Sequence, residues 1–191
     1  MNRLTGKVHS LDELIERIRS MPEIMERVTH WHTLPPREAR TVPFPRGIHP
    51  KLRQALEDKG IHALYTHQAS AFEAVANGEH IVAVTPTASG KTLCYNLPVL
   101  QSLLEDDSVR ALYLFPTKAL AQDQVAELQE LADRMEAEFK CHTYDGDTPP
   151  SPRQAIRNAG HVVVTNPDML HSAILPHHTK WVKLFENLRY I

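Results

Sequence analysis

The sequence predicts an α/β domain in which helices cover both faces of a parallel sheet. Four short apolar runs, typical of buried strands, alternate with helical stretches. The runs cover residues 81–85, 111–115, 139–143 and 162–165. The helical stretches between them cover residues 91–104, 118–137 and 152–158. This alternation predicts parallel strands, because parallel neighbours need crossover connections that are usually helical.

An N-terminal helix and a proline-rich connector precede the alternating region. Residues 10–21 predict an amphipathic helix, with Ser10 and Glu13 at the spacing of a capping box. Its apolar face consists of Leu11, Leu14, Ile15 and Ile18. Five prolines between residues 30 and 50 predict an extended connector. We therefore expect an N-terminal helical arm over residues 1–48 and a main domain over residues 49–191.

Two further helices are expected at the start of the main domain. Pro50 suits the first turn of a short helix that ends at Gly60. Its inward positions are Leu52, Ala55 and Leu56. Residues 66–77 predict a second helix, which ends at Gly78. The final residues, 188–191, look like the beginning of another buried strand, so we expect the domain to be incomplete at its C-terminus.

The composition is that of an ordinary globular protein. Of the 191 residues, 42% are hydrophobic and 23% are charged, and no apolar run approaches the length of a membrane span. The N-terminus lacks the apolar segment of a secretory signal. We therefore expect a cytoplasmic protein with no membrane partner. Two cysteines without a CxxC spacing and scattered histidines argue against a disulfide framework or a zinc site.

A candidate phosphate-binding loop lies at residues 85–92, TPTASGKT, which match the template G-x-x-x-x-G-K-[ST] except at the first glycine. An apolar run precedes the loop and an apolar helical stretch follows it, as the template requires. Gly90 lets the backbone approach the phosphates, Lys91 would bind the outer phosphates, and Thr92 would bind Mg²⁺. The expected loop consists of Thr85, Pro86, Thr87, Ala88, Ser89, Gly90, Lys91 and Thr92. The alternative is an ordinary strand-to-helix turn with a surface lysine.

Polar segments follow three of the predicted strands, at the point where each strand ends. Ligands of open parallel sheets bind at the carboxyl ends of the strands. Helix N-termini there suit nucleic-acid phosphates, even at a net charge of -2. The residues expected to contact nucleic acid are Pro116, Thr117, Lys118, Gln122, Gly146, Thr148, Thr165, Asn166 and Pro167. For any one segment alone, helix capping is the alternative, and Asp145, Asp147 and Asp168 are interpreted as loop-shaping or capping residues.

Arg153 and Arg157 are four residues apart in a predicted helix and therefore share a face. A solvated face is the preferred interpretation, with phosphate contacts as the alternative. Trp31 and Trp181 have no assigned chemistry, and we expect both to serve packing.

Several segments from residue 65 onward, about two-thirds of the chain, resemble motifs of a known family. They are YTHQ at 65–68, the loop at 85–92, FPTKALAQDQ at 115–124, YDGDTP at 144–149 and TNPDML at 165–170. Together they resemble the first RecA-like domain of superfamily-two helicases of the DEAD/DEAH-box kind. More narrowly, the sequences of three of these segments resemble the mitomycin repair factor A branch of bacterial DNA helicases. The three segments lie at residues 115–124, 144–149 and 165–170. The resemblance implies a RecA-like P-loop NTPase fold.

This resemblance implies the motor domain of an ATP-dependent DNA helicase that acts in DNA repair. ATP and Mg²⁺ would be its cofactors, with Lys91 and Thr92 as the catalytic residues of this chain. Gln68 would read adenine, since its amide carries a donor and an acceptor; capping of the following helix is the alternative. The implied partners are DNA in preference to RNA, a second RecA-like domain and a metal-binding C-terminal region.

One part of the family pattern is missing. No D-E-x-[HD] segment occurs in the chain, although this segment supplies the carboxylates for ATP hydrolysis in the family. We expect a domain truncated before that strand, which does not unwind nucleic acid by itself. Two alternative functions are a DEAD-box RNA helicase domain and a non-catalytic nucleotide-binding module.

Overall fold

The computed structural model describes residues 10–35 and 38–191. The chain divides into two compact units after Glu38. The boundary expected from the sequence lies later, after residue 48. The difference arises because β1 (Thr41–Val42) pairs with β2 (Leu64–Tyr65) and so belongs to the second unit. Among the described residues, no helix combines the length and hydrophobicity of a membrane span.

The first unit contains α1 (Leu11–Arg19) and the short α2 (Pro22–Met25). The hydroxyl of Ser10 caps α1 by accepting from the N–H of Glu13 at 3.1 Å. The guanidinium of Arg19 lies over the ring of Trp31 at 4.8 Å. The predicted amphipathic helix is therefore confirmed, with its end at Arg19, because Pro22 begins a separate turn.

The sheet of the second unit has four parallel strands in the order β4–β5–β3–β6. The strands are β3 (Arg110–Leu114), β4 (Cys141–Thr143), β5 (Val162–Thr165) and β6 (Leu188–Tyr190). Leu114 pairs with Thr165, so the carboxyl ends of β3 and β5 lie side by side. These strands confirm the predictions for residues 111–115, 139–143 and 162–165, and also the strand pattern at residues 188–191.

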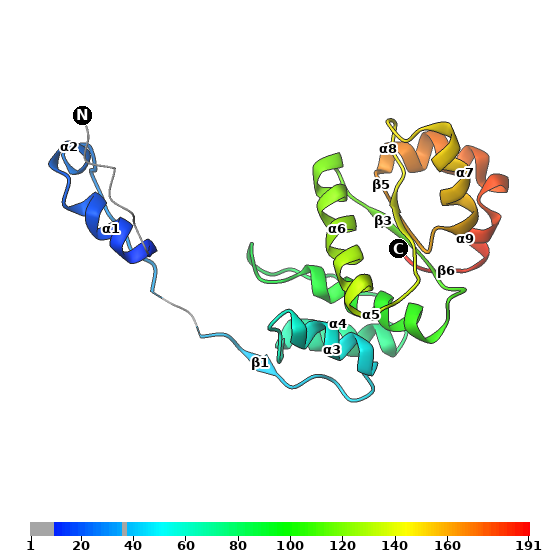
Figure 1. Ribbon diagram of the computed structural model, residues 1–191, viewed down its shortest axis with the longest axis horizontal. Coiled ribbons are helices and arrows are strands. Elements are labelled where there is room, and N and C mark those ends of the chain that lie inside the picture. Colours follow the sequence, from blue (N-terminus) through cyan, green and yellow to red (C-terminus); the bar gives the residue numbers. More distant parts are fainter. Residues whose placement is uncertain (1–9, 36–37) are drawn as a thin grey trace. The chain divides into compact units, whose positions relative to one another are not determined.

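Helices cover both faces of the sheet, as predicted. Successive strand residues point to opposite faces, so Ala111 and Val162 belong to one core cluster whereas Leu112 and Val163 belong to another. Figure 1 shows α6 on one side of the strands and α7 and α9 on the other. The helical segments are α3 (Pro50–Asp58), α4 (Thr66–Ala76), α5 (Thr92–Glu105), α6 (Lys118–Arg134), α7 (Pro150–Ala159), α8 (Pro167–Met169), the π-helical turn η1 (Leu170–Ile174), the 3₁₀ segment η2 (Leu175–Lys180) and α9 (Val182–Glu186).

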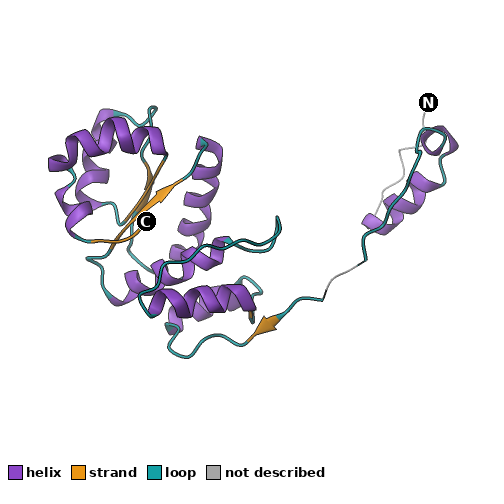
Figure 2. Ribbon diagram, turned by 180° about the vertical axis from the view of Figure 1, so that it is seen from behind, coloured by secondary structure: helices purple, strands orange, loops and turns teal. Residues whose placement is uncertain are grey.

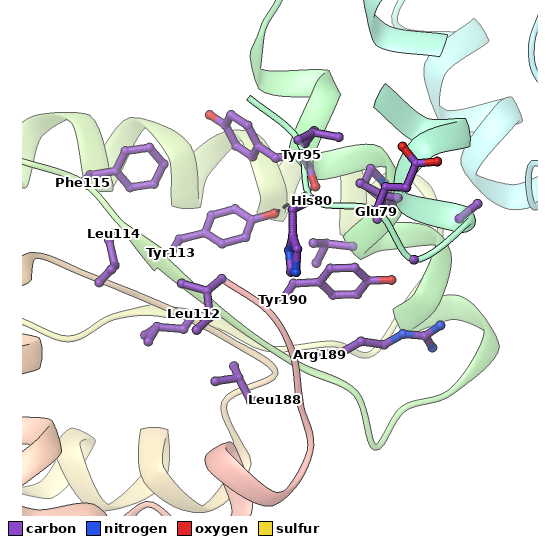
Figure 3. A pocket seen from close by; sticks show the side chains of 17 residues that line it. Glu79, His80, Tyr95, Leu112, Tyr113, Leu114, Phe115, Leu188, Arg189 and Tyr190 are labelled. Carbon is purple, nitrogen blue, oxygen red and sulfur yellow. Dashed lines mark hydrogen bonds between the residues drawn. The ribbon is translucent and has the colours of Figure 1, made fainter. Parts of the chain in front are cut away.

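The run at residues 81–85 does not form the predicted strand, and this part of the prediction is wrong. Figure 2 draws it as a loop, in which Val82 is 90% and Val84 is 87% exposed. A strand needs a neighbour to pair its backbone groups, and none of the described strands pairs with this run. A cavity of about 720 Å³ is lined both by Ile81 and by Tyr190 of β6 (Figure 3). The run therefore lies apart from the sheet edge.

Candidate functional site

The loop before α5 has a backbone that favours glycine at one position. Gly90 has φ +73° and Ala88 has φ +59°, both in the left-handed region. A Cβ atom on Gly90 would lie 2.6 Å from Nε2 of Gln68, closer than real contacts allow. Glycine at the position before Lys91 therefore has a steric reason here, in addition to letting the backbone approach phosphates.

The ammonium group of Lys91 lies within this loop. Its Nζ donates to the carbonyl oxygens of Thr85 and Pro86 at 2.6 and 2.7 Å. The hydroxyls of Thr85 and Ser89 are 2.5 Å apart and close the other side of the turn. Because α5 begins at Thr92, the positive end of its helix dipole adjoins the same loop. An ammonium and a helix N-terminus together suit a phosphate group.

Gln68 joins α4 to the loop. Its Oε1 accepts from the N–H of Tyr65 at 2.9 Å, and its Nε2 donates to the carbonyl of Gly90 at 2.8 Å. The side chain is 3% exposed. The capping alternative is thus realised, and one donor hydrogen and one acceptor lone pair of the amide are engaged. Each atom of the amide can still make a second hydrogen bond.

His67 is a contact to the loop that the sequence did not predict. Its ring stacks on Tyr65 with centroids 5.6 Å apart, and its Nε2 lies 3.0 Å from the carbonyl of Ser89. The neighbouring Cys94 is buried, and burial raises the pKa of its thiol. The only signal in the sequence was the position of His67 beside Gln68 in the YTHQ segment.

A second group of predicted residues gathers at the carboxyl ends of β3, β4 and β5. Thr117 and Lys118 line a small cavity there with Asp145, Thr165 and Asn166. The Oγ1 of Thr117 accepts from Leu120 N–H at 3.3 Å, and the Oδ1 of Asn166 accepts from Met169 N–H at 2.8 Å. These two side chains therefore cap α6 and α8, which is the alternative considered for each segment.

The other predicted contact residues differ in accessibility. Pro116, Gln122, Gly146 and Pro167 are exposed. Thr165 is not, since it is 2% exposed and its Oγ1 donates to the carbonyl of Tyr144 at 2.6 Å. The Thr165 hydroxyl therefore links β5 to the residue that follows β4 by a hydrogen bond, and it does not face solvent.

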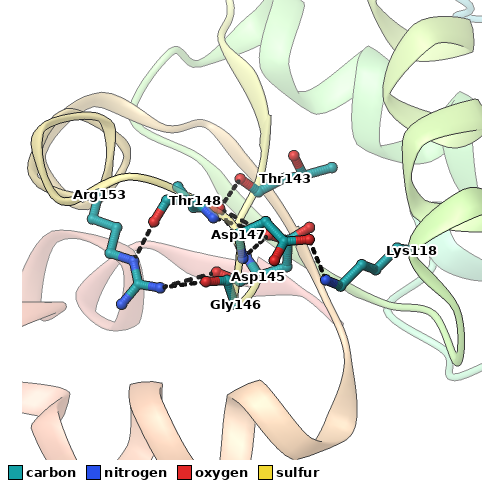
Figure 4. Close-up of polar contacts among 7 residues, drawn as sticks. All are labelled: Lys118, Thr143, Asp145, Gly146, Asp147, Thr148 and Arg153. Atoms are coloured by element: carbon teal, nitrogen blue, oxygen red, sulfur yellow. Dashed lines mark hydrogen bonds and ion pairs between the residues drawn. The ribbon is translucent and has the colours of Figure 1, made fainter.

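The segment from Asp145 to Thr148 is a closed turn (Figure 4). Oδ1 of Asp145 accepts from the N–H groups of Asp147 and Thr148 at 2.9 and 3.1 Å. The hydroxyl of Thr148 accepts from Asp145 N–H at 3.0 Å. Asp145 thus shapes the turn, whereas the carboxylate of Asp147 forms an ion pair with Lys118. The hydrogen bond to Asp147 and its charge raise the pKa of Lys118, so the ammonium keeps its proton.

The solvated face predicted for Arg153 is wrong. Its side chain is partly buried and donates to the backbone of the turn at residues 145–148. The helical spacing correctly put Arg153 on the same helix as Arg157, in α7, but did not show that the turn folds back onto that helix.

The sequence matches a protein family, curated proteins and solved structures. The model of the DEAD/DEAH box helicase family matches residues 65–191. A relative described as "Uncharacterized ATP-dependent helicase YprA", from Bacillus subtilis (strain 168), is 62% identical over 97% of this chain and 24% of its own length. "ATP-dependent helicase hrq1" from Schizosaccharomyces pombe is 39% identical over 97% of this chain and 18% of its own length. The chain therefore spans a quarter or less of these relatives.

Solved structures support the same grouping. The crystal structure of the DUF1998 helicase MrfA bound to DNA and AMPPNP is 63% identical, with a TM-score of 0.84 over 95% of this chain and 25% of that one. The DEAD-box helicase Mss116, bound to ssRNA and UDP-BeF, has a TM-score of 0.58 over 70% of this chain and 31% of that one. At 20% identity, the second likeness shows the fold alone. The predicted RecA-like fold is confirmed.

Proposed function

The chain belongs to the DEAD/DEAH box helicase family, and from this premise we propose that it is the ATP-binding motor domain of an ATP-dependent DNA helicase acting in DNA repair. The observation that carries the proposal is the loop at residues 85–92. There, the ammonium of Lys91 and the N-terminus of α5 converge on a backbone that Gly90 allows to approach its ligand closely. The function concerns the full-length protein, since this chain spans a quarter or less of the relatives it matches.

In this proposal Lys91 would exchange its two carbonyl partners, at Thr85 and Pro86, for oxygens of the ATP triphosphate. Charged phosphate oxygens form stronger hydrogen bonds with an ammonium than neutral carbonyls do, so the exchange is favourable. The Thr92 hydroxyl, at the first position of α5, would hold Mg²⁺. Mg²⁺ would neutralise charge on the phosphates, and the carboxylates that complete its coordination would come from outside these 191 residues. A second RecA-like domain and a metal-binding C-terminal region are proposed as partners in a cytoplasmic protein.

Gln68 is proposed to read the adenine base with the amide hydrogen and lone pair that Tyr65 and Gly90 leave open. We predict that Gln68→Ala lowers the preference for ATP over GTP by about 10-fold, the effect of one lost base-edge pair. The measurement is competition of each nucleotide against a fluorescent ATP analogue. Gln129→Ala, an exposed glutamine on α6, is the matched control. If the preference persists while only the melting temperature falls, Gln68 is a capping residue and no more.

Lys118 is proposed to bind a nucleic-acid phosphate in exchange for the carboxylate of Asp147. We predict that Lys118→Ala weakens binding of single-stranded DNA by about 3- to 10-fold and lowers the slope of log K against log salt by about 0.7, the value for one phosphate on a single strand. Lys140→Ala removes the same charge from the other end of β4 and should leave both quantities unchanged. An unchanged slope in Lys118→Ala would remove this lysine from the contact surface.

DNA is proposed over RNA because the MrfA structures, 63% identical to this chain, are described as bound to DNA. The test is fluorescence anisotropy of the full-length protein with labelled single-stranded DNA, competed by unlabelled DNA or RNA of the same sequence. We expect DNA to compete at the lower concentration. Tighter binding of RNA would instead support the RNA helicase alternative, and absence of binding to both would support a nucleotide-binding module.

A further inference from the structure

Arg153 makes three hydrogen bonds to one turn of the backbone. Its Nε donates to the carbonyl of Thr148 at 2.7 Å, and one terminal nitrogen donates to the carbonyls of Asp145 and Gly146 at 3.2 and 3.3 Å (Figure 4). The turn precedes α7, whereas Arg153 lies within α7, so the helix holds the loop that leads into it. A planar guanidinium is suited to this role because its donors form a rigid fork.

The guanidinium is itself held in place by aromatic packing. It lies over the ring of Tyr144 at 5.4 Å, and Tyr144 is 2% exposed. The Tyr144 ring meets Trp181 edge to face, with centroids 4.8 Å apart and planes at 85°. Trp181 is 0% exposed. Arg153 thus links the turn to the second core cluster, which fixes the position of the fork.

The contacts of Arg153 show which way three carbonyl groups of the turn face. In a trans peptide the N–H points opposite to the preceding carbonyl. Because the Asp145 carbonyl faces Arg153, the N–H of Gly146 is directed away from α7. Figure 4 shows Arg153 on one side of the turn and Lys118 on the other. The Gly146 position is open, since a Cβ atom there would have nothing within 4 Å.

We propose that Arg153 is a positioning residue for nucleic-acid binding: it holds the 145–148 turn so that the Gly146 N–H and Lys118 face the same phosphate backbone. The inference rests on the proposed DNA-binding function. In this proposal Arg153 acts through the turn, because its Nε and one terminal nitrogen already donate to the three carbonyls. Arg153 differs in this respect from Lys118, whose ammonium group would itself contact the phosphate.

The salt dependence of binding distinguishes a positioning arginine from a contacting one. A cationic side chain that neutralises a phosphate adds about 0.7 to the slope of log K against log salt on a single strand, whereas a neutral N–H adds none. We expect Arg153→Ala in the full-length protein to weaken binding of single-stranded DNA by about 10-fold with the slope unchanged. Arg157→Ala removes an equal charge from the same helix and should change neither quantity.

The second variant, Arg153→Lys, distinguishes a loss of positioning from a loss of folding. It keeps the charge over Tyr144 but replaces the fork by a single ammonium, so we expect reduced DNA affinity, an unchanged slope and unchanged affinity for an ATP analogue. Full affinity in Arg153→Lys, or a slope lowered by about 0.7 in Arg153→Ala, would overturn the proposal. Failure of the proposed function gives a different result: the wild-type protein would then show no salt-dependent binding of DNA at all.

Discussion

Lys91→Ala is expected to weaken binding of an ATP analogue by at least about 100-fold while leaving the fold intact. The estimate follows from the loss of charge-assisted hydrogen bonds to phosphate, each worth about 1.5–3 kcal/mol. The fold should persist because the ammonium of Lys91 donates to carbonyls of its own loop, at Thr85 and Pro86. Fluorescence titration of the full-length protein with a labelled ATP analogue and Mg²⁺ measures the affinity, and circular dichroism verifies the fold.

The control for this experiment is Lys51→Ala, which removes an exposed lysine from the first turn of α3. Its nucleotide affinity should equal that of the wild type. Equal affinity in Lys91→Ala as well would show that the loop is an ordinary turn with a surface lysine, and the assignment of residues 85–92 to phosphate binding would be abandoned.

Trp181→Ala is expected to lower the free energy of unfolding by about 3–5 kcal/mol, as for other large aromatic residues removed from a core. Trp181 is 0% exposed and packs with Tyr144, Ile174 and Leu184 on one face of the sheet. Loss of the indole leaves a cavity beneath Tyr144, and therefore beneath the ring on which Arg153 lies. Urea unfolding followed by far-ultraviolet circular dichroism gives the value.

Trp31→Ala is the matched substitution, because the chain has two tryptophans. Trp31 is 39% exposed and contacts Arg19 in the first unit. Its replacement should change the free energy of unfolding of the second unit by less than about 1 kcal/mol. Equal effects of the two substitutions would contradict the role of Trp181 as a core residue.

The sheet could be predicted where strands lie between helices. The runs at 111–115 and 162–165 are apolar on both faces, as expected for strands that helices cover on both sides, and they form the paired β3 and β5. The run at 81–85 carries the same apolar signal but stays an exposed loop. An apolar pattern indicates which side chains a segment would bury. Forming a strand also requires a neighbouring strand that pairs with its backbone groups.

The turn at residues 85–92 could be predicted because its sequence signal lies in consecutive residues. Gly90 takes the left-handed backbone that suits glycine, whereas phosphate binding by Lys91 stays a prediction. The contacts of Arg153 and Asp147 could not be predicted, because they join residues brought together by the turn before α7 and by the packing of α6 near β4. Nothing in a helical spacing shows whether an arginine faces solvent or a folded-back loop.

The most direct test of the account is ATP hydrolysis by the full-length protein with and without single-stranded nucleic acid. If residues 85–92 and the strand ends form the motor domain of a DNA helicase, hydrolysis should rise on addition of DNA and should rise less with RNA of the same sequence. Lys91→Ala should remove the activity in both conditions. Hydrolysis that is absent, or that responds to RNA alone, would contradict the assignment.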